Sequence, residues 1–417
     1  MIHSKDHIFK QKALHFAATF ETCCFLNSHQ YTDRYGQYEC IIAFGNENEL
    51  HAQTGKAFST LKSFYEQYKD WLFGFLSYEL KNEVEDLSTT QTDQLDFPDL
   101  YFFIPQHIIG IKEGKIEVLK GSPTMISAIE QFSFIESRSE KISIESRFSK
   151  DNYLEQVKKI QQHIKRGDIY EVNFCQEFFA QHAQINPVVV YSELSKISPT
   201  PFSGFFKIKD KYILSATPER FLCKRGNKLI SQPIKGTAKR STDTKQDLSI
   251  KQDFKANKKE QAENVMIVDL VRNDLTKSAK KGTVKVDELF GIYSFPQVYQ
   301  MISTISCELD PKIHFVDAIK NTFPMGSMTG APKLRAMQLI DTYENSKRGV
   351  YSGSFGYISP NGDFDFNVII RSILYNSSTK YLSFQVGGAI TYQSDPEQEY
   401  EECLLKASAI MGVLSTG

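Results

Sequence analysis

The lysine at position 235 stands in a short segment, 232–237, that contains no other charged residue. The nearby proline and the glycine that follows it predict a half-buried turn at the end of a strand. Burial disfavours the ammonium form and lowers the pKa of a lysine from about 10.4, and the resulting neutral amine is a nucleophile. A lysine exposed in a turn is the simpler interpretation, and these residues alone leave both open.

Two pairs of glutamates have the spacing of a shared helical face. Glu260 and Glu263 are three residues apart, which places both carboxylates on one side of a helix. Glu399 and Glu402 repeat this spacing near the C-terminal end. Four carboxylates from two helices would form an oxygen-rich site suited to Mg²⁺. Each pair taken alone also fits a solvated helix face.

The segment 323–333 could bind an anion where it leads into an amphipathic helix. Ser327 and Thr329 can cap that helix, and Gly330 permits close approach of the backbone. The free N–H groups of a helix N-terminus favour an anion. The pattern of a phosphate loop is absent, and a plain capped helix is the alternative.

Two later segments could also hold anions. Arg371 lies in the alternating strand predicted at 367–372, where a forked cation flanked by apolar residues needs a carboxylate from the protein or from a ligand. Gly387 and Gly388 end a predicted strand, where main-chain N–H groups could hold a second carboxylate, although a tight turn also explains them. A lysine nucleophile, a magnesium site and anion-binding groups together would suit a small polyanionic substrate.

The elements that must position these residues are predicted to be mostly strands. Runs rich in β-branched and aromatic residues predict strands at 39–44, 100–104, 204–208, 211–215, 366–373 and 381–386. Apolar periodicity predicts helices at 149–166, 260–275 and 331–343. Strands come in adjacent pairs as often as they alternate with helices, which favours mixed or antiparallel sheets. The polar stretch at 136–147 is the best candidate for a domain boundary.

The composition excludes several classes of protein. The 417 residues include 49 basic and 50 acidic side chains, and a net charge of −1 argues against nucleic-acid binding. The apolar stretches are far shorter than the roughly 18 residues that span a membrane, and the first residues lack a secretory signal, so we expect a cytoplasmic protein. Seven scattered cysteines without a C-x-x-C pair predict neither a disulfide framework nor a zinc site.

Six ordered motifs make the chain resemble the chorismate-utilising enzymes. They lie at 74–80, 167–174, 215–221, 233–237, 262–274 and 330–337. The Pro-Ile-Lys-Gly-Thr form at 233–237 resembles the aminodeoxychorismate branch, whereas the anthranilate branch has alanine in place of the lysine. The resemblance implies an α/β (α+β) sandwich of two large antiparallel sheets with helices outside. It also implies an N-terminal region at 1–140 and a chorismate-binding catalytic domain at 141–417.

The resemblance implies amination of chorismate at C4 to 4-amino-4-deoxychorismate, with Mg²⁺ as cofactor. The Lys235 amine would attack C2 while the C4 hydroxyl leaves, and ammonia would then enter at C4 and expel the lysine. Glu219 would protonate the departing hydroxyl; a pair with Arg220 is the alternative for Glu219. Direct magnesium ligands would be Glu263 and Glu402, with an outer pair formed by Glu260 and Glu399. Substrate-binding residues would be Tyr351, Arg371, Gly387, Gly388, Ser327, Thr329 and Gly330.

The sequence departs from the family pattern at two positions of interest. Glu171 stands where many relatives have glutamine or lysine, and the absence of lysine argues against water as the nucleophile. Gln300 replaces a frequent histidine. Ammonia would come from a separate glutamine amidotransferase subunit, because no glutaminase half is recognisable. The alternatives are anthranilate synthase component I, an isochorismate or salicylate synthase, a catalytically silent chorismate-binding subunit and an unrelated Schiff-base enzyme.

Overall fold

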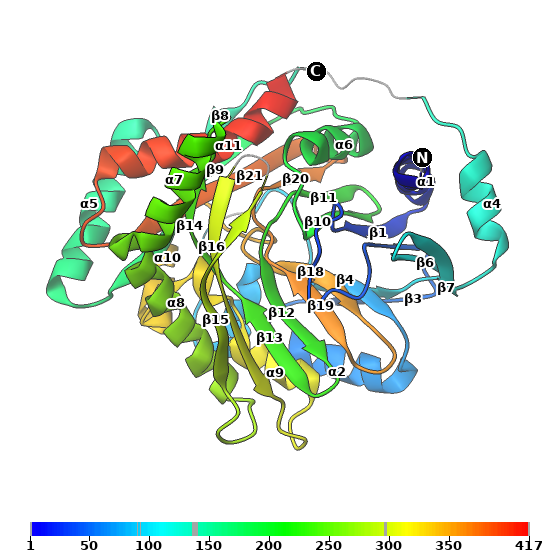
Figure 1. The fold of residues 1–417 in the computed structure, drawn as a ribbon, viewed down its shortest axis with the longest axis horizontal. Helices are drawn as coiled ribbons and strands as arrows, with labels where there is room; N and C mark the ends of the chain where they lie inside the picture. The colour runs from blue at the N-terminus through cyan, green and yellow to red at the C-terminus, as the bar shows by residue number, and fades with distance from the viewer. Residues whose placement is uncertain (1, 90, 92, 136–140, 296–297, 416–417) are drawn as a thin grey trace.

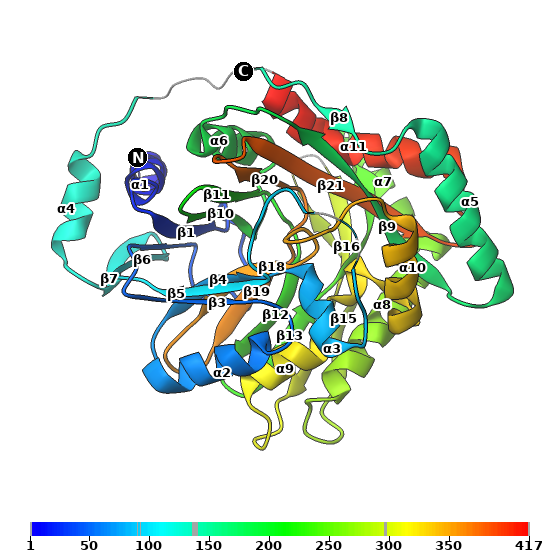
Figure 2. The same cartoon turned by 180° about the vertical axis from the view of Figure 1, so that it is seen from behind.

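The computed structural model describes residues 2–89, 91, 93–135, 141–295 and 298–415, and its strands form two large sheets. Figures 1 and 2 show the sheets facing each other, with helices on the two outer sides. The recorded strand pairs are antiparallel. The predicted sandwich of two antiparallel sheets with helices outside is therefore confirmed.

The first sheet has eleven strands, and a short strand at one end, β8 (Glu145–Ser146), pairs with β9. Its remaining strands are, in spatial order, β17 (Gly330–Ala331), β9 (Glu171–Ala180), β21 (Tyr381–Ile390), β20 (Ser372–Asn376), β11 (Lys211–Ser215), β10 (Ser203–Ile208), β1 (Thr22–Asn27), β2 (Cys40–Phe44), β6 (His107–Lys112) and β7 (Lys115–Lys120).

The second sheet has ten strands, of which the long strand β15 (Lys285–Ser294) pairs only with β16. The others are, in spatial order, β14 (Ile234–Lys239), β16 (Val298–Glu308), β13 (Lys228–Gln232), β12 (Arg220–Arg225), β19 (Phe364–Asn367), β18 (Ser354–Ile358), β4 (Leu72–Leu76), β5 (Leu100–Ile104) and β3 (Asn48–Ala52).

Helices cover the outer faces of both sheets. In Figures 1 and 2, α6 and α11 lie over the first sheet, and α2 and α9 lie over the second. The α-helices are α1 (Ile2–Ala17), α2 (Ala57–Tyr68), α3 (Lys81–Val84), α4 (Thr124–Gln131), α5 (Lys150–Arg166), α6 (Pro187–Ile197), α7 (Thr244–Ala256), α8 (Lys258–Thr276), α9 (Phe315–Thr322), α10 (Lys333–Tyr343) and α11 (Pro396–Ser415). Two short 3₁₀ turns are η1 (Tyr78–Leu80) and η2 (Gly326–Met328).

Strand alternation explains how the two cores are filled. On β10, Phe206 points between the sheets and its ring centroid lies 5.6 Å from that of Phe75 on β4. Its neighbour Phe205 points to the other face, 5.8 Å from the ring of Tyr191 on α6. Successive residues of a strand face opposite sides, so one strand supplies both the core between the sheets and the core beneath the helices.

Strands from both halves of the chain share the two sheets. The four N-terminal strands β1, β2, β6 and β7 complete the first sheet, and β3, β4 and β5 complete the second. The predicted boundary at residue 140 lies outside the described residues. All seven cysteines are free and buried, as predicted. No helix in the described part of the chain has the length and apolar character needed to cross a membrane.

Several local predictions are confirmed, and α5 shows why. The Ser149 hydroxyl accepts the N–H of Asn152 at the start of this helix, and Gly167 ends it in the left-handed region at a φ of 83°. These are the standard N-cap and C-terminal glycine signals. The predicted helix at 260–275 corresponds to α8 and that at 331–343 to α10, and the strand predicted at 39–44 corresponds to β2.

Three local predictions are wrong. The strand at 366–373 is interrupted, because Arg371 adopts a left-handed backbone with a φ of 51° between β19 and β20. No side chain caps α10: its N-cap is Pro332, and the Thr329 hydroxyl instead donates to the Gly326 carbonyl at 3.1 Å. Gly387 and Gly388 lie within β21 and pair with β9, so they do not end the strand.

Candidate active site

Lys235 is buried at the edge of the second sheet. It lies on β14, where the pairing with β16 shifts register between Ile234 and Thr237, and the residue is only 9% exposed. Its Nζ atom lies 3.8 Å from Oε1 of Glu171, the first residue of β9 in the other sheet. The lysine therefore bridges the two sheets. The predicted burial is confirmed, but the predicted turn is wrong because Lys235 lies within a strand, and the alternative of a solvent-exposed turn is wrong as well.

Glu219 lies just before β12 and is also buried, at 4% exposure. Burial raises the pKa of its carboxyl group to about 7 from an ordinary value of 4.5. The Ser327 hydroxyl, the Ile234 N–H group, Lys235 and Arg371 all act in the opposite direction. An acid with this pKa holds a proton for much of the time near neutral pH.

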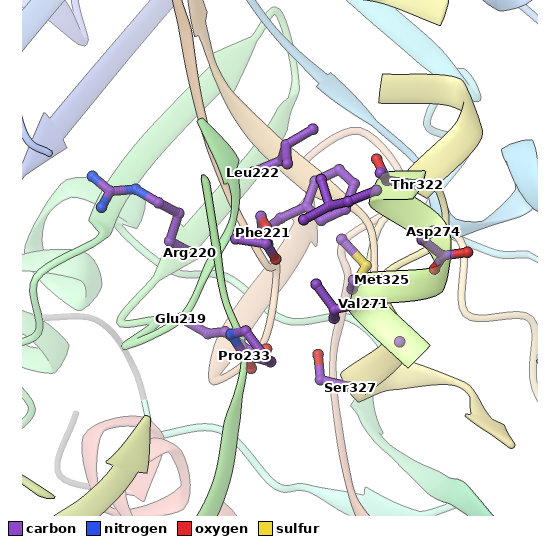
Figure 3. A pocket seen from close by; sticks show the side chains of 13 residues that line it. Glu219, Arg220, Phe221, Leu222, Pro233, Val271, Asp274, Thr322, Met325 and Ser327 are labelled. Carbon is purple, nitrogen blue, oxygen red and sulfur yellow. Dashed lines mark hydrogen bonds between the residues drawn. The ribbon is translucent and has the colours of Figure 1, made fainter. Parts of the chain in front are cut away.

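A small cavity lies beside Glu219, and Figure 3 shows Glu219 and Ser327 on opposite sides of it. Apolar side chains such as Val271 and Met325 line much of the cavity, and polar residues including Asp274 and Thr322 also line it. These neighbours explain why water does not solvate the carboxyl group and why its proton is retained.

Arg220 does not pair with Glu219, although the two are adjacent in sequence. Its guanidinium donates to both carboxylate oxygens of Asp365 at 2.9 Å, to the Gln232 side chain at 2.6 Å and to Asp33. The fully buried Arg220 is thus satisfied on the other side of the strand. The alternative pairing considered for Glu219 is wrong, and its carboxyl group remains available to the site.

Arg371 faces Glu219 from the turn between β19 and β20. Burial lowers the pKa of its guanidinium, and the charge of Glu219 opposes that effect. In the described part of the chain, no recorded hydrogen bond or ion pair uses the Arg371 side chain. A guanidinium without protein partners is suited to bind a carboxylate ligand.

The four predicted metal-binding glutamates lie on two helices and influence one another's pKa values, without forming a compact group. Glu260 and Glu263 lie on α8, and Glu399 and Glu402 lie on α11. Burial raises the pKa of Glu263 to about 7; Lys235 opposes this, and the charge of Glu260 adds to it. Burial also raises the pKa of Glu260, and Glu402 adds to that effect. The sequence-based prediction that these side chains share one site is consistent with these mutual influences.

Two lysines neutralise part of this acidic cluster, and the sequence analysis missed both. The Lys406 Nζ atom lies 2.7 Å from Glu402 and donates to the Gly387 carbonyl at 2.8 Å. The Lys259 Nζ atom lies 3.9 Å from Glu263. Each lysine is four residues from its glutamate on the same helix, and this spacing could have identified both pairs.

The donor atoms of the four glutamates suit a hard cation. Carboxylate oxygens are the ligands that Mg²⁺ prefers. Burial raises the pKa values of Glu260, Glu263 and Glu399, whereas at Glu402 the lowering of the pKa by Lys406 and other lysines outweighs burial. Among the described residues, however, no three acidic, histidine or cysteine side chains lie close enough to form a ready metal-binding group. The carboxylate oxygens of the cluster suit Mg²⁺, and the ammonium groups of Lys406 and Lys259 would compete with the ion for them.

Tyr351 lies in a buried polar network next to the glycines of β21. Its hydroxyl is 3.5 Å from Cys175 Sγ, and an alanine Cβ at Gly387 would lie 2.5 Å from the same sulfur. Arg348 braces this region, because its guanidinium donates to the main-chain oxygens of Met328 at 2.6 Å and Asn173 at 2.8 Å. Arg348 was not identified from the sequence, and nothing in its local pattern distinguishes it.

The remaining predicted residues line the same region. Gly330 has a φ of 154°, and a Cβ there would lie 2.3 Å from the Glu171 carbonyl oxygen. The buried Thr329 accepts the Asn173 N–H through its main-chain oxygen at 2.7 Å. A Cβ at Gly388 would lie 3.3 Å from Glu399 Oε2. These contacts and mutual charge effects place the predicted lysine, acids, arginine, tyrosine and glycines in one region of the structure.

The fold and this arrangement define a class of enzyme. The sequence profile of the chorismate binding enzyme family matches residues 21–412, and the chain belongs to this family. It is 31% identical over 369 residues to aminodeoxychorismate synthase component 1 of Bacillus subtilis (strain 168), and the matched region covers 84% of this chain and 78% of that protein. It is 32% identical over 364 residues to anthranilate synthase component 1 of Cereibacter sphaeroides, and the matched region covers 81% of this chain and 72% of that protein.

A solved structure supports the fold independently. The crystal structure of anthranilate synthase component I from Streptococcus pneumoniae superposes with a TM-score of 0.79, covering 91% of this chain and 93% of that chain at 24% identity. At this level of identity the similarity demonstrates the shared fold.

Proposed function

We propose that this enzyme aminates chorismate at C4 with ammonia to form 4-amino-4-deoxychorismate. The observation that carries the proposal is the buried Lys235, whose amine lies between Glu171 and the acidic cluster. A buried lysine among carboxylates is placed for covalent chemistry and would serve little purpose in packing alone. Relatives named aminodeoxychorismate synthase component 1 add support.

The proposed reaction has two covalent steps. The neutral Lys235 amine forms a bond to C2, the two ring double bonds shift, and the C4–O bond breaks. Glu219 gives its proton to the leaving hydroxyl, which departs as water. Ammonia then forms a bond to C4, the double bonds shift back, and the C2–N bond breaks to release Lys235 as a neutral amine. The product carries the new ammonium group at C4.

Other residues would bind and orient the substrate. Arg371 and Tyr351 would hold the enolpyruvyl carboxylate near the main chain of Gly387 and Gly388. Ser327, Thr329 and Gly330 would line the side of the ring carboxylate. Among the described residues, no hydrogen bond or ion pair engages the Arg371 side chain, which supports this assignment.

Magnesium is the cofactor in this proposal. Glu263 and Glu402 would bind it directly, and Glu260 and Glu399 would bind it through water. When bound, the ion would neutralise the ring carboxylate and polarise the leaving oxygen. The environment of Glu263 supports the assignment: burial raises its pKa, the charge of Glu260 adds to that effect, and a bound cation would stabilise the carboxylate form against both.

A glutamine amidotransferase subunit would supply the ammonia. The name component 1 carried by relatives, including one from Escherichia coli (strain K12) at 33% identity, supports a two-subunit enzyme. Without the amidotransferase subunit, a high concentration of an ammonium salt should supply the ammonia.

The experiment is a product analysis of the purified chain with chorismate, ammonium chloride and Mg²⁺. We expect 4-amino-4-deoxychorismate, separated by liquid chromatography and identified by mass spectrometry, and no product without Mg²⁺. If fluorescent anthranilate and pyruvate were the main products, the proposal would be wrong and the chain would be an anthranilate synthase. If isochorismate were the main product, the chain would be an isomerase.

A further inference from the structure

Glu171 is an acid that the proposed reaction does not yet use, and its environment is unusual. It is 1% exposed, and within the described structure neither of its carboxylate oxygens has a hydrogen-bond partner. Among the described residues, its one ion pair is the 3.8 Å contact with the Lys235 Nζ atom. Burying an unsatisfied carboxylate costs several kcal/mol, so a purely structural role does not explain it.

The backbone holds Glu171 firmly beside the lysine. It is the first residue of β9, and it pairs with Ala331 of β17. The neighbouring Tyr170 N–H donates to the Ala331 carbonyl at 2.7 Å. The glycine at 330 allows this close approach, since any Cβ there would collide with the Glu171 carbonyl oxygen. The main chain of Glu171 is therefore held in place at the site.

The other acids around Lys235 already have assigned work. Glu219 faces the lysine from the segment before β12 and must keep a proton for the leaving hydroxyl. Glu260 and Glu263 face it from α8, and Glu402 faces it from α11; these three belong to the proposed magnesium site. Glu171 also faces Glu263. It is thus the one neighbouring acid, among the described residues, that is free to take a proton.

We propose that Glu171 is the catalytic proton acceptor that converts the Lys235 ammonium group into the attacking amine. The inference rests on the proposed function and assigns a role to a buried acid that the proposed reaction leaves unused. One proton moves from Nζ to a Glu171 oxygen, and the freed electron pair forms the bond to C2. When ammonia has displaced the lysine, Nζ takes the proton back from Glu171, and both residues are restored.

The absence of hydrogen bonds to Glu171 suits this task. Donors to a carboxylate stabilise its charge and weaken it as a base, and this carboxylate has none. The gap of 3.8 Å is longer than a hydrogen bond, so a short movement of the flexible lysine side chain on substrate binding would complete the contact.

The test is Glu171→Gln, which keeps the size of the side chain and removes the base. With saturating chorismate, ammonium and Mg²⁺, we expect kcat at pH 7 to fall at least tenfold while the KM for chorismate stays within about twofold. The loss should shrink as the pH rises to 9.5, because hydroxide in the solvent can then accept the proton in place of the missing carboxylate. Glu171→Asp should recover part of the rate at pH 7, which a merely structural role would not predict.

A control on the same strand separates this effect from a general loss of charge. Glu177 is a buried acid of β9 that pairs with Arg147 at 3.0 Å, away from Lys235. Glu177→Gln should leave the shape of the pH–rate profile unchanged. An unaltered kcat and pH profile in Glu171→Gln would overturn this inference. If the wild-type chain makes 4-amino-4-deoxychorismate in the same assay, the proposed function stands whatever the result for Glu171→Gln. If Glu171→Gln does not fold, the pH profile of Glu171→Asp against wild type decides, and an identical profile overturns the inference.

Discussion

Replacing Glu219 with glutamine should stabilise the protein at neutral pH while it destroys the activity. Burial raises the pKa of this carboxyl group from 4.5 to about 7 in the folded chain. One pKa unit corresponds to about 1.4 kcal/mol, so the folded state disfavours the carboxylate form by about 3 kcal/mol. Glutamine carries no charge at any pH and avoids this cost.

The pH dependence has a definite sign. Below pH 4.5 the carboxyl group is protonated in both the folded and the unfolded chain, and the two proteins should differ little. Between pH 4.5 and 7 the unfolded chain releases the proton first, so the stability that the protonated group contributes is lost as the pH rises. Above pH 7 the full cost of about 3 kcal/mol applies to the wild-type protein only.

Urea unfolding of both proteins at pH 5, 6, 7 and 8 measures this difference directly. The gain in unfolding free energy for Glu219→Gln should grow from less than about 1 kcal/mol at pH 5 towards about 3 kcal/mol at pH 8. The rate of C4 amination should fall at least 100-fold, because the leaving hydroxyl loses its proton donor. A stability difference that is the same at every pH would refute the assignment of a raised pKa to Glu219.

Four further predictions concern neighbouring residues. Lys235→Ala should abolish C4 amination, and Lys235→Arg should not restore it, since arginine stays charged; unchanged product by mass spectrometry would exclude the covalent role. Gly387→Ala should lower the unfolding free energy by about 2 kcal/mol or more, because the added Cβ would lie 2.3 Å from a main-chain oxygen of β9. In Gly388→Ala the nearest atom to the Cβ lies at 3.3 Å, so urea unfolding should show a much smaller loss. Arg220→Met should lower the unfolding free energy by about 3–5 kcal/mol by leaving buried carboxylates without their partner, and a loss below about 1 kcal/mol would contradict this. Magnesium affinity should weaken as the pH falls below 7, because Glu263 must lose a proton to bind the ion. Calorimetric titration in two buffers of different ionisation enthalpy should detect the released proton. Binding without proton release would argue against Glu263 as a ligand.

Local signals in the sequence were sufficient for the elements that carry the site. The serine and glycine at the two ends of α5 determine where that helix begins and ends. The spacing of three residues identified both acidic pairs, and the helices α8 and α11 then bring the pairs together. These signals depend on neighbours in the chain, and the folded structure preserves them.

The features that the sequence could not predict depend on distant parts of the chain. The left-handed backbone of Arg371 interrupts a run that looks like one continuous strand, because the chain there passes from one sheet to the other. The burial of Glu171 beside Lys235 joins two strands 64 positions apart, and no local pattern indicates it. Contacts of this kind require the complete arrangement of the sheets.

The most direct test of the central claim is to trap the bond between Lys235 and the substrate. The purified chain would be mixed with chorismate and Mg²⁺ in the absence of ammonia, quenched with acid and digested for mass spectrometry. We predict a chorismate-derived adduct on the peptide that contains Lys235, which disappears when ammonium is added before the quench. Steady production of 4-amino-4-deoxychorismate by a chain that never carries such an adduct would contradict the account.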